Sequence, residues 1–160
     1  MTNTEFNDAF TEQVRKLTFE KQLQLCILVC KKLFPDYSSF SIENRWGEPT
    51  RLLDTINFIE KSGSAPADSK KIKSMMSKIH QITPDTEDFP DCSFALNSCV
   101  AIYCTLELIL NRDPQSAEAV GTAYTDTIDF KIQEEKELTQ EEIDLHPEMI
   151  SARQFLLETS

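Results

Sequence analysis

Glycine is scarce in this sequence, with only three among 160 residues. A fold rich in β-hairpins needs glycine in its tight turns, and a phosphate-binding loop needs it where the backbone approaches the ligand. Both are therefore excluded. The sequence also shows no hairpin pattern and no internal repeat of fixed period, so it favours helices from the outset.

Histidine is rarer still, with two residues, which bears on metal chemistry. A di-iron site in a helical bundle needs a Glu-x-x-His pair on each of two helices. Ser77 stands three residues before His80 and Ile143 three residues before His146, so the pair is missing at both histidines. Zinc-type CxxC pairs are also absent. We expect no metal and no cofactor, and the lack of a catalytic constellation favours a protein that is not an enzyme.

Basic residues are outnumbered, since 16 Lys and Arg against 27 Asp and Glu give a formal net charge of −11. This charge repels phosphates and anionic lipids, so it excludes nucleic acid as a partner and favours a basic one. The longest weakly charged stretch, 92–106, is too short and too interrupted by polar residues to span a membrane. The acidic, polar first ten residues lack a secretory pattern. We expect a cytoplasmic protein without membrane contact.

The cysteines form an odd set embedded in apolar runs: Cys26, Cys30, Cys92, Cys99 and Cys104. A secreted disulfide framework is usually even in number and carried by loops. We therefore predict that all five thiols are reduced and mostly buried, as small hydrophobic side chains.

Helical spacing of apolar residues and capping signals are the strongest patterns present. They predict helices over 18–34, 48–63, 68–79 and 92–111, then a helix starting at Pro114, a short one after the capping box of Thr139 and Glu142, and a last one through about residue 157. The stretch 92–111 has apolar residues all round its axis, which places it at the centre. The prediction is an all-α fold, a compact bundle of about six or seven helices around a central apolar helix, in a single domain over 1–160.

Two helix ends carry specific expectations. Pro35 is expected to stop the first of these helices, because proline lacks the N–H that a helix interior needs. Gly63 is expected to end the second as a left-handed C-cap.

Several blocks of sequence resemble a known family in order and spacing over nearly the whole chain. They read LCILVCKKLFPDY, RWGEPTRLLDTI, ITPDTEDF followed by ALNSCVAI, and LTQEEIDLHPEM. The family is the bacterial YjaG-like family, domain of unknown function 416. The resemblance implies a cytoplasmic, all-helical bacterial domain, and the family has no assigned reaction or ligand.

Acidic residues are concentrated in the second half of the chain. Residues 1–80 hold 12 basic and 10 acidic side chains, whereas residues 81–160 hold 4 and 17. The most acidic segment presents Glu134, Glu135, Glu137, Glu141, Glu142 and Asp144. One interpretation is a solvated face that keeps the protein soluble. The other is a docking surface for a basic protein, since complementary charge raises association rates and fixes orientation.

The docking interpretation predicts a non-catalytic binding protein, for example an immunity or antitoxin-type inhibitor of a basic toxin or nuclease. The alternative is a small-ligand domain or enzyme with a pocket between helices, near Asn97 and Cys99 and including Tyr103 or Asp88. A contiguous acidic face favours the first hypothesis, and a deep cleft lined by those four residues favours the second. The oligomeric state is left open.

Two features near residue 46 have simpler interpretations. Trp46 lies at a helix junction near Tyr37 and Phe40, and such an aromatic residue is more often part of the core than a partner anchor. Arg51 and Asp54, three residues apart, are expected to form a solvated ion pair.

Overall fold

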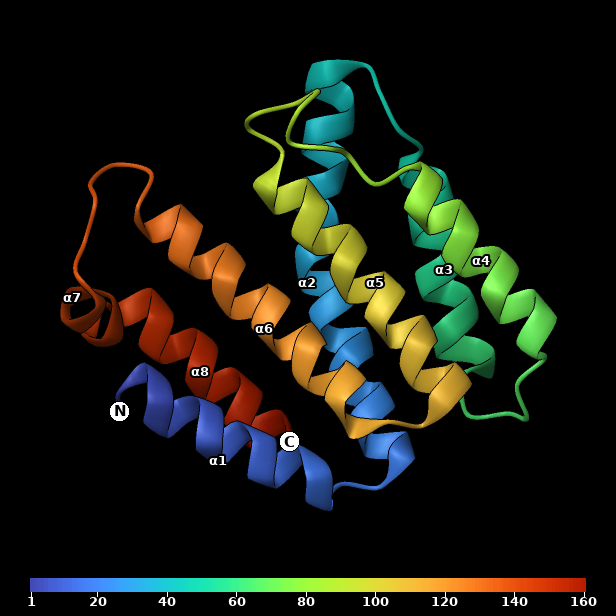
Figure 1. The fold of residues 1–160 in the computed structure, drawn as a ribbon, viewed down its shortest axis with the longest axis horizontal. Helices are drawn as coiled ribbons and strands as arrows, with labels where there is room; N and C mark the ends of the chain where they lie inside the picture. The colour runs from blue at the N-terminus through green and yellow to red at the C-terminus, as the bar shows by residue number, and fades with distance from the viewer.

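The computed structural model describes residues 1–160 and consists of helices without strands. Its eight helices are α1 (Asn3–Lys16), α2 (Phe19–Asn44), α3 (Pro49–Ser62), α4 (Ser69–Gln81), α5 (Ser93–Asn111), α6 (Pro114–Ile132), α7 (Gln140–Leu145) and α8 (Pro147–Thr159). The helix α5 packs against α2, α3, α4 and α6. Figure 1 shows α3 and α4 on one side of α2 and α5, and α1 and α8 beyond α6 on the other. The predicted all-α bundle is confirmed.

The central position of α5 follows from its sequence. None of its residues is fully exposed before Asn111, and Ile102, Leu106 and Leu108 are completely buried. By length and composition alone α5 is long and apolar enough to cross a membrane, but half of its apolar stretch is buried inside the bundle. A helix enclosed by other helices needs the same apolar composition, so the core position accounts for it.

The sequence prediction omitted α1. Thr2 and Glu5 form a capping box at its start, because the Thr2 hydroxyl accepts from the Glu5 N–H while the Glu5 carboxylate accepts from the Thr2 N–H. Phe6, Phe10 and Val14 recur every four residues and are buried. The bundle therefore has one helix more than the predicted upper number.

The expected stop at Pro35 is wrong, because α2 continues through it to Asn44. Pro35 lies on the exposed side of α2, so the carbonyl of Lys31 that loses its intrahelical partner is close to solvent. Beyond the proline, Tyr37 and Phe40 are buried in the core. Their burial stabilises two further turns of helix against the local effect of proline.

Of the other local expectations, the one for Trp46 is confirmed and those for Gly63 and Arg51 are wrong. Gly63 is right-handed, with φ −63°, so the predicted left-handed cap is wrong; a Cβ there would come within 2.7 Å of the Leu23 side chain, and close packing explains the glycine instead. Trp46 packs against the core, as expected. Arg51 pairs with Glu48 at 3.2 Å rather than with Asp54.

Candidate partner-binding cleft

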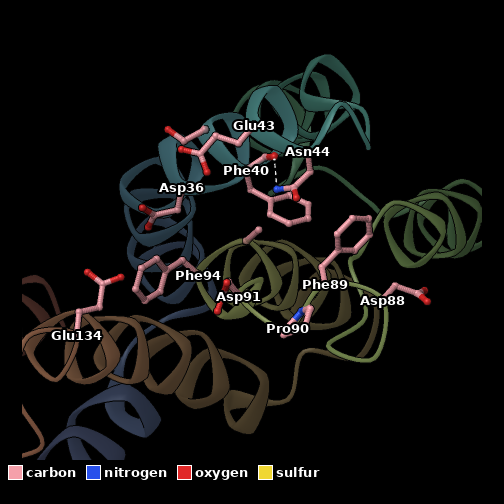
Figure 2. Close-up of a pocket in the computed structure, with 12 residues that line it drawn as sticks. Asp36, Phe40, Glu43, Asn44, Asp88, Phe89, Pro90, Asp91, Phe94 and Glu134 are labelled. Carbon is pink, nitrogen blue, oxygen red and sulfur yellow. Dashed lines mark hydrogen bonds between the residues drawn. The ribbon is translucent and has the colours of Figure 1, made fainter.

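An open cleft of about 630 Å³ lies where four segments meet: the second half of α2, the loop after α4, the start of α5 and the end of α6. Figure 2 shows side chains from these segments directed around one hollow. The lining residues are Asp36, Ser39, Phe40, Glu43, Asn44, Asp88, Phe89, Pro90, Asp91, Phe94, Ala95 and Glu134.

Aromatic rings form the apolar part of the cleft. The rings of Phe40 and Phe89 meet edge to face at 5.2 Å between centroids. Behind them, Trp46 lies 6.2 Å from Phe40 and 5.2 Å from Phe89. Since each ring is held by another, this side of the cleft has a fixed shape.

The loop between α4 and α5 is held in place by its own hydrogen bonds. The Asp85 carbonyl accepts from the N–H groups of Asp88 and Phe89, at 3.1 and 2.9 Å. At the start of the loop, the Tyr37 hydroxyl donates to the Ile82 carbonyl at 2.7 Å and accepts from the Glu48 N–H at 3.2 Å. Burial raises the pKa of Tyr37 to about 12, so this phenol stays protonated and keeps donating. The loop is therefore tied to the end of α2.

The packing around Tyr37 also explains Gly47. Gly47 has φ +88°, in the region that favours glycine, and a Cβ there would overlap the Tyr37 hydroxyl. Glycine thus allows the turn between α2 and α3 to close over the tyrosine.

Five carboxylates line the cleft: Asp36, Glu43, Asp88, Asp91 and Glu134. Only Asp36 has a basic partner, since Lys131 Nζ lies 2.8 Å from its Oδ1 and 3.0 Å from its Oδ2. The other four are exposed and make neither an ion pair nor a side-chain hydrogen bond. No group of three or more His, Cys, Asp or Glu side chains is close enough to hold a metal ion. The arrangement therefore suits several separated cationic groups.

The acidic segment predicted from the sequence continues from this cleft. Glu134 lines the cleft, and Glu135, Glu137, Glu141 and Glu142 are exposed along the connection to α7 and on α7 itself. Glu142 has a structural role as well, since it closes the capping box with Thr139. We call these five residues, together with the cleft carboxylates Asp36, Glu43, Asp88 and Asp91, the acidic surface.

Asp144 does not belong to the acidic surface. Its side chain is 13% exposed and lies 2.8 Å from Arg153 Nη2, so the expected exposure is wrong at this position. The reason is that Arg153, on the next helix α8, reaches α7 and pairs with this carboxylate. The charge of Asp144 is used inside the protein.

The alternative set of residues is not brought together. Asn97 donates to the Thr127 hydroxyl at 3.1 Å, and Asp88 lines the acidic cleft. Tyr103 lines a separate hollow with His80. Cys99 is completely buried, and burial raises its pKa to about 12, so the thiolate that a nucleophile needs is disfavoured. No observation favours a pocket for chemistry at Asn97 and Cys99.

All five thiols are free, and only Cys104 is partly exposed. Burial raises the pKa of Cys30 to about 12 and that of Cys104 to about 11. At pH 8, a thiol reagent such as dithionitrobenzoate is therefore expected to react with at most one group within minutes, and with five after denaturation without reductant. Rapid reaction of two or more thiols in the folded protein contradicts this burial, and fewer than five in denaturant reveals a disulfide.

Three cleft carboxylates were not found from the sequence: Asp36, Glu43 and Asp91. Asp36 and Glu43 are separated acids on α2, and Asp91 follows Asp85, Glu87 and Asp88 in a loop whose position in the fold the sequence does not show. Asp36 and Glu43 are seven residues apart, which is two helical turns, but this spacing signals a shared face only once α2 is known to continue past Pro35.

Comparison with known proteins addresses the family and the fold. A family model described as a protein of unknown function, DUF416, matches residues 9–159. A crystal structure of a DUF416 family protein from Shewanella baltica OS155 is similar to this chain with a TM-score of 0.79 and 18% sequence identity, covering 93% of this chain and 82% of the other. A search of curated proteins gave no match.

Proposed function

The chain belongs to the DUF416 family, whose function is unknown, and from that premise we propose that it is a non-catalytic protein that binds a basic protein partner in the cytoplasm through the acidic surface. The observation that carries the proposal is the cleft, where five carboxylates surround a cluster of aromatic rings and four of them have no partner within the protein.

The unpaired carboxylates favour a cationic partner energetically. Like charges held close together repel one another and oppose the compact state, and a bound cation relieves that repulsion. The same charges draw a basic partner toward the cleft from a distance comparable with the Debye length, which is roughly 8 Å at physiological salt. Association is therefore expected to depend strongly on salt.

The combination of rings and carboxylates matches the anatomy of protein interfaces. Such interfaces place aromatic residues at the centre and polar groups at the rim. In the cleft, Phe40, Phe89 and Phe94 provide apolar contact for the stem of a lysine or arginine, and the carboxylates receive its charged end. Beyond the cleft, the exposed Glu135, Glu137 and Glu141 continue the acidic surface along the chain to α7, which suits a partner with several cationic groups rather than one small cation.

An inhibitor of a basic toxin or nuclease is the class of protein that this design fits best. A nuclease presents a positively charged groove to its substrate phosphates, and an acidic surface on a small helical domain covers such a groove by mimicking the charge of the phosphates. An immunity or antitoxin-type role follows from this complementarity.

The test is capture of partners from the source cytoplasm, followed by association kinetics with the purified partner. The cleft variant Glu43→Lys/Asp91→Lys/Glu134→Lys is expected to associate at least about tenfold more slowly than the wild type at low salt, mainly through the on-rate. The face variant Glu135→Lys/Glu137→Lys/Glu141→Lys is expected to slow association several-fold; it spares Glu142, whose carboxylate caps α7.

The matched control is Asp8→Lys/Asp54→Lys/Glu158→Lys, which changes the net charge equally at exposed positions on α1, α3 and α8. It is expected to slow association by less than about twofold, because its charges lie away from the contact. If control and cleft variants associate equally slowly, only net charge matters; if all associate at the wild-type rate, the acidic surface is a solvated face. Either result refutes the proposed docking site.

A further inference from the structure

We infer that Lys131 occupies, in the unbound protein, the position that a lysine side chain of the partner takes on binding, and that Lys131 then moves from Asp36 to Glu134. This inference rests on the proposed function, because it names the chemical group that enters the acidic cleft and the internal group that it replaces.

The starting observation is an ammonium group that the fold itself places at the cleft. Lys131 Nζ contacts both oxygens of Asp36, at 2.8 and 3.0 Å, and lies 5.2 Å from the centroid of the Phe94 ring. Asp36 and Phe94 both line the cleft, and they come from α2 and α5 while Lys131 comes from α6. A carboxylate and a ring face together bind an ammonium more strongly than either does alone.

This position can be reached from solvent. The side chain of Lys131 is 37% exposed, and that of Asp36 is 18% exposed. An ion pair that is partly exposed to solvent contributes little net stability, because water competes for both groups. Another ammonium can therefore replace Lys131 at small cost in free energy.

Exchange is favoured over joint occupation. Two ammonium groups a few ångströms apart repel each other strongly, even at the effective dielectric constant of a protein surface. A partner lysine at Asp36 therefore requires Lys131 to leave.

Glu134 provides the second position for Lys131. Glu134 lies one turn further along the chain, where its N–H donates to the Lys131 carbonyl at 3.3 Å, and its carboxylate has no ion pair. Figure 2 shows the Glu134 side chain beside the Phe94 ring. Residues three apart on a helical turn lie within side-chain reach of each other, so we expect rotation about the Lys131 side-chain bonds to bring its ammonium to Glu134.

The consequence is that Lys131 competes with the partner. Removing its ammonium frees Asp36 and strengthens binding of a lysine side chain by more than the loss of one positive charge does elsewhere. Lys136 offers a matched comparison, because it is exposed on the acidic segment, makes no ion pair and does not line the cleft.

The experiment measures the affinity of hexalysine for the wild type, Lys131→Gln and Lys136→Gln at low salt by calorimetry. Both variants lower the net charge by one. Lys131→Gln is expected to bind at least about fivefold more tightly than Lys136→Gln, a coupling at the lower end of the usual range between two sites. In the wild type, the NMR signal of the Lys131 side chain is expected to shift on saturation with hexalysine.

Equal affinities of the two variants, with both melting curves close to the wild type, overturn the inference while the proposed function stands. If Lys131→Gln is unstable, the wild-type NMR signal decides: a Lys131 signal unmoved at saturation overturns the inference. If hexalysine binds none of the three proteins, and neither does the cytoplasmic partner, the proposed function itself fails.

Discussion

Replacing Ile102 by aspartate is expected to unfold most of the domain or to lower its melting temperature strongly. Ile102 lies in the middle of α5 and is completely buried, with other helices on several sides. An aspartate there is left without water or a counter-charge, which destabilises by about 4 kcal/mol or more. Because the total stability of a domain is only about 5–15 kcal/mol, the variant is expected to be largely unfolded or to melt at a far lower temperature.

Two controls on the same measurement separate burial from the substitution itself. Val100→Asp changes a residue that is only partly buried, so its carboxylate reaches water and a smaller loss is expected. Ile42→Asp changes a side chain that is 74% exposed and is expected to leave the melting temperature almost unchanged. Circular dichroism during a thermal scan measures the melting temperatures of the three variants, which are expected to rise in the order Ile102→Asp, Val100→Asp, Ile42→Asp. An Ile102→Asp protein that melts within a few degrees of the wild type contradicts the central role of α5.

Helix starts were predictable from the sequence because capping is local chemistry. The predicted helices begin at 18, at 68, at Pro114 and after the capping box of Thr139. In the structure Thr18, Asp68, Asp113 and Thr139 each accept a hydrogen bond from the first turn of the helix that follows. The same rule applied to the first residues identifies α1, whose capping box has the same form. The pattern at the start of α1 is therefore as clear in the sequence as the one at the start of α7.

Helix ends were less predictable because packing between distant segments decides them. Pro35 has the local signature of a stop, but Tyr37 donates to the Ile82 carbonyl and Phe40 packs against Phe89, both in the segment before α5, which a local pattern cannot show. Gly63 has the signature of a left-handed cap, yet the nearby Leu23 side chain explains it. At both positions the sequence carries a local signal, but packing against a segment distant in the chain determines the structure.

The acidic surface shows the same division. Glu134, Glu135, Glu137, Glu141 and Glu142 are close in sequence, so their clustering could be predicted. Asp36, Glu43, Asp88 and Asp91 come from α2 and the α4–α5 loop, and only the fold gathers them beside Glu134. Asp144 was misassigned because a carboxylate in an acidic run gives no sign of the arginine that will pair with it.

Replacing Arg153 by methionine is expected to destabilise the protein by about 3 kcal/mol, the usual cost of leaving one member of a buried ion pair alone. Arg153 is 4% exposed. Its Nη2 donates to Asp144 at 2.8 Å and to Asn3 at 3.4 Å, and its Nη1 donates to the Met1 carbonyl at 3.1 Å. The guanidinium therefore joins α8 to α7 and to the start of α1.

The stability lost on replacing Arg153 is expected to depend on pH in a defined direction. Burial raises the pKa of Asp144, but hydrogen bonds from Arg153 and Gln140 outweigh burial, so this pKa is lower in the folded protein than its ordinary value. A carboxylate with a lowered folded pKa contributes stability above its unfolded pKa, near 4, and loses that contribution as the pH falls through the folded pKa. The difference between wild type and Arg153→Met is therefore largest at neutral pH and shrinks below about pH 4.

Urea unfolding at pH 7 and at pH 3 measures both effects, and a double-mutant cycle with Asp144→Asn isolates the pair. At pH 7 the double variant Arg153→Met/Asp144→Asn is expected to be more stable than the sum of the single losses requires, because residues that share a partner are not additive. Additive losses show that Arg153 acts through Met1 and Asn3 alone. If the free energy of unfolding differs between wild type and Arg153→Met by the same amount at both pH values, the Asp144 charge does not stabilise the contact between α7 and α8.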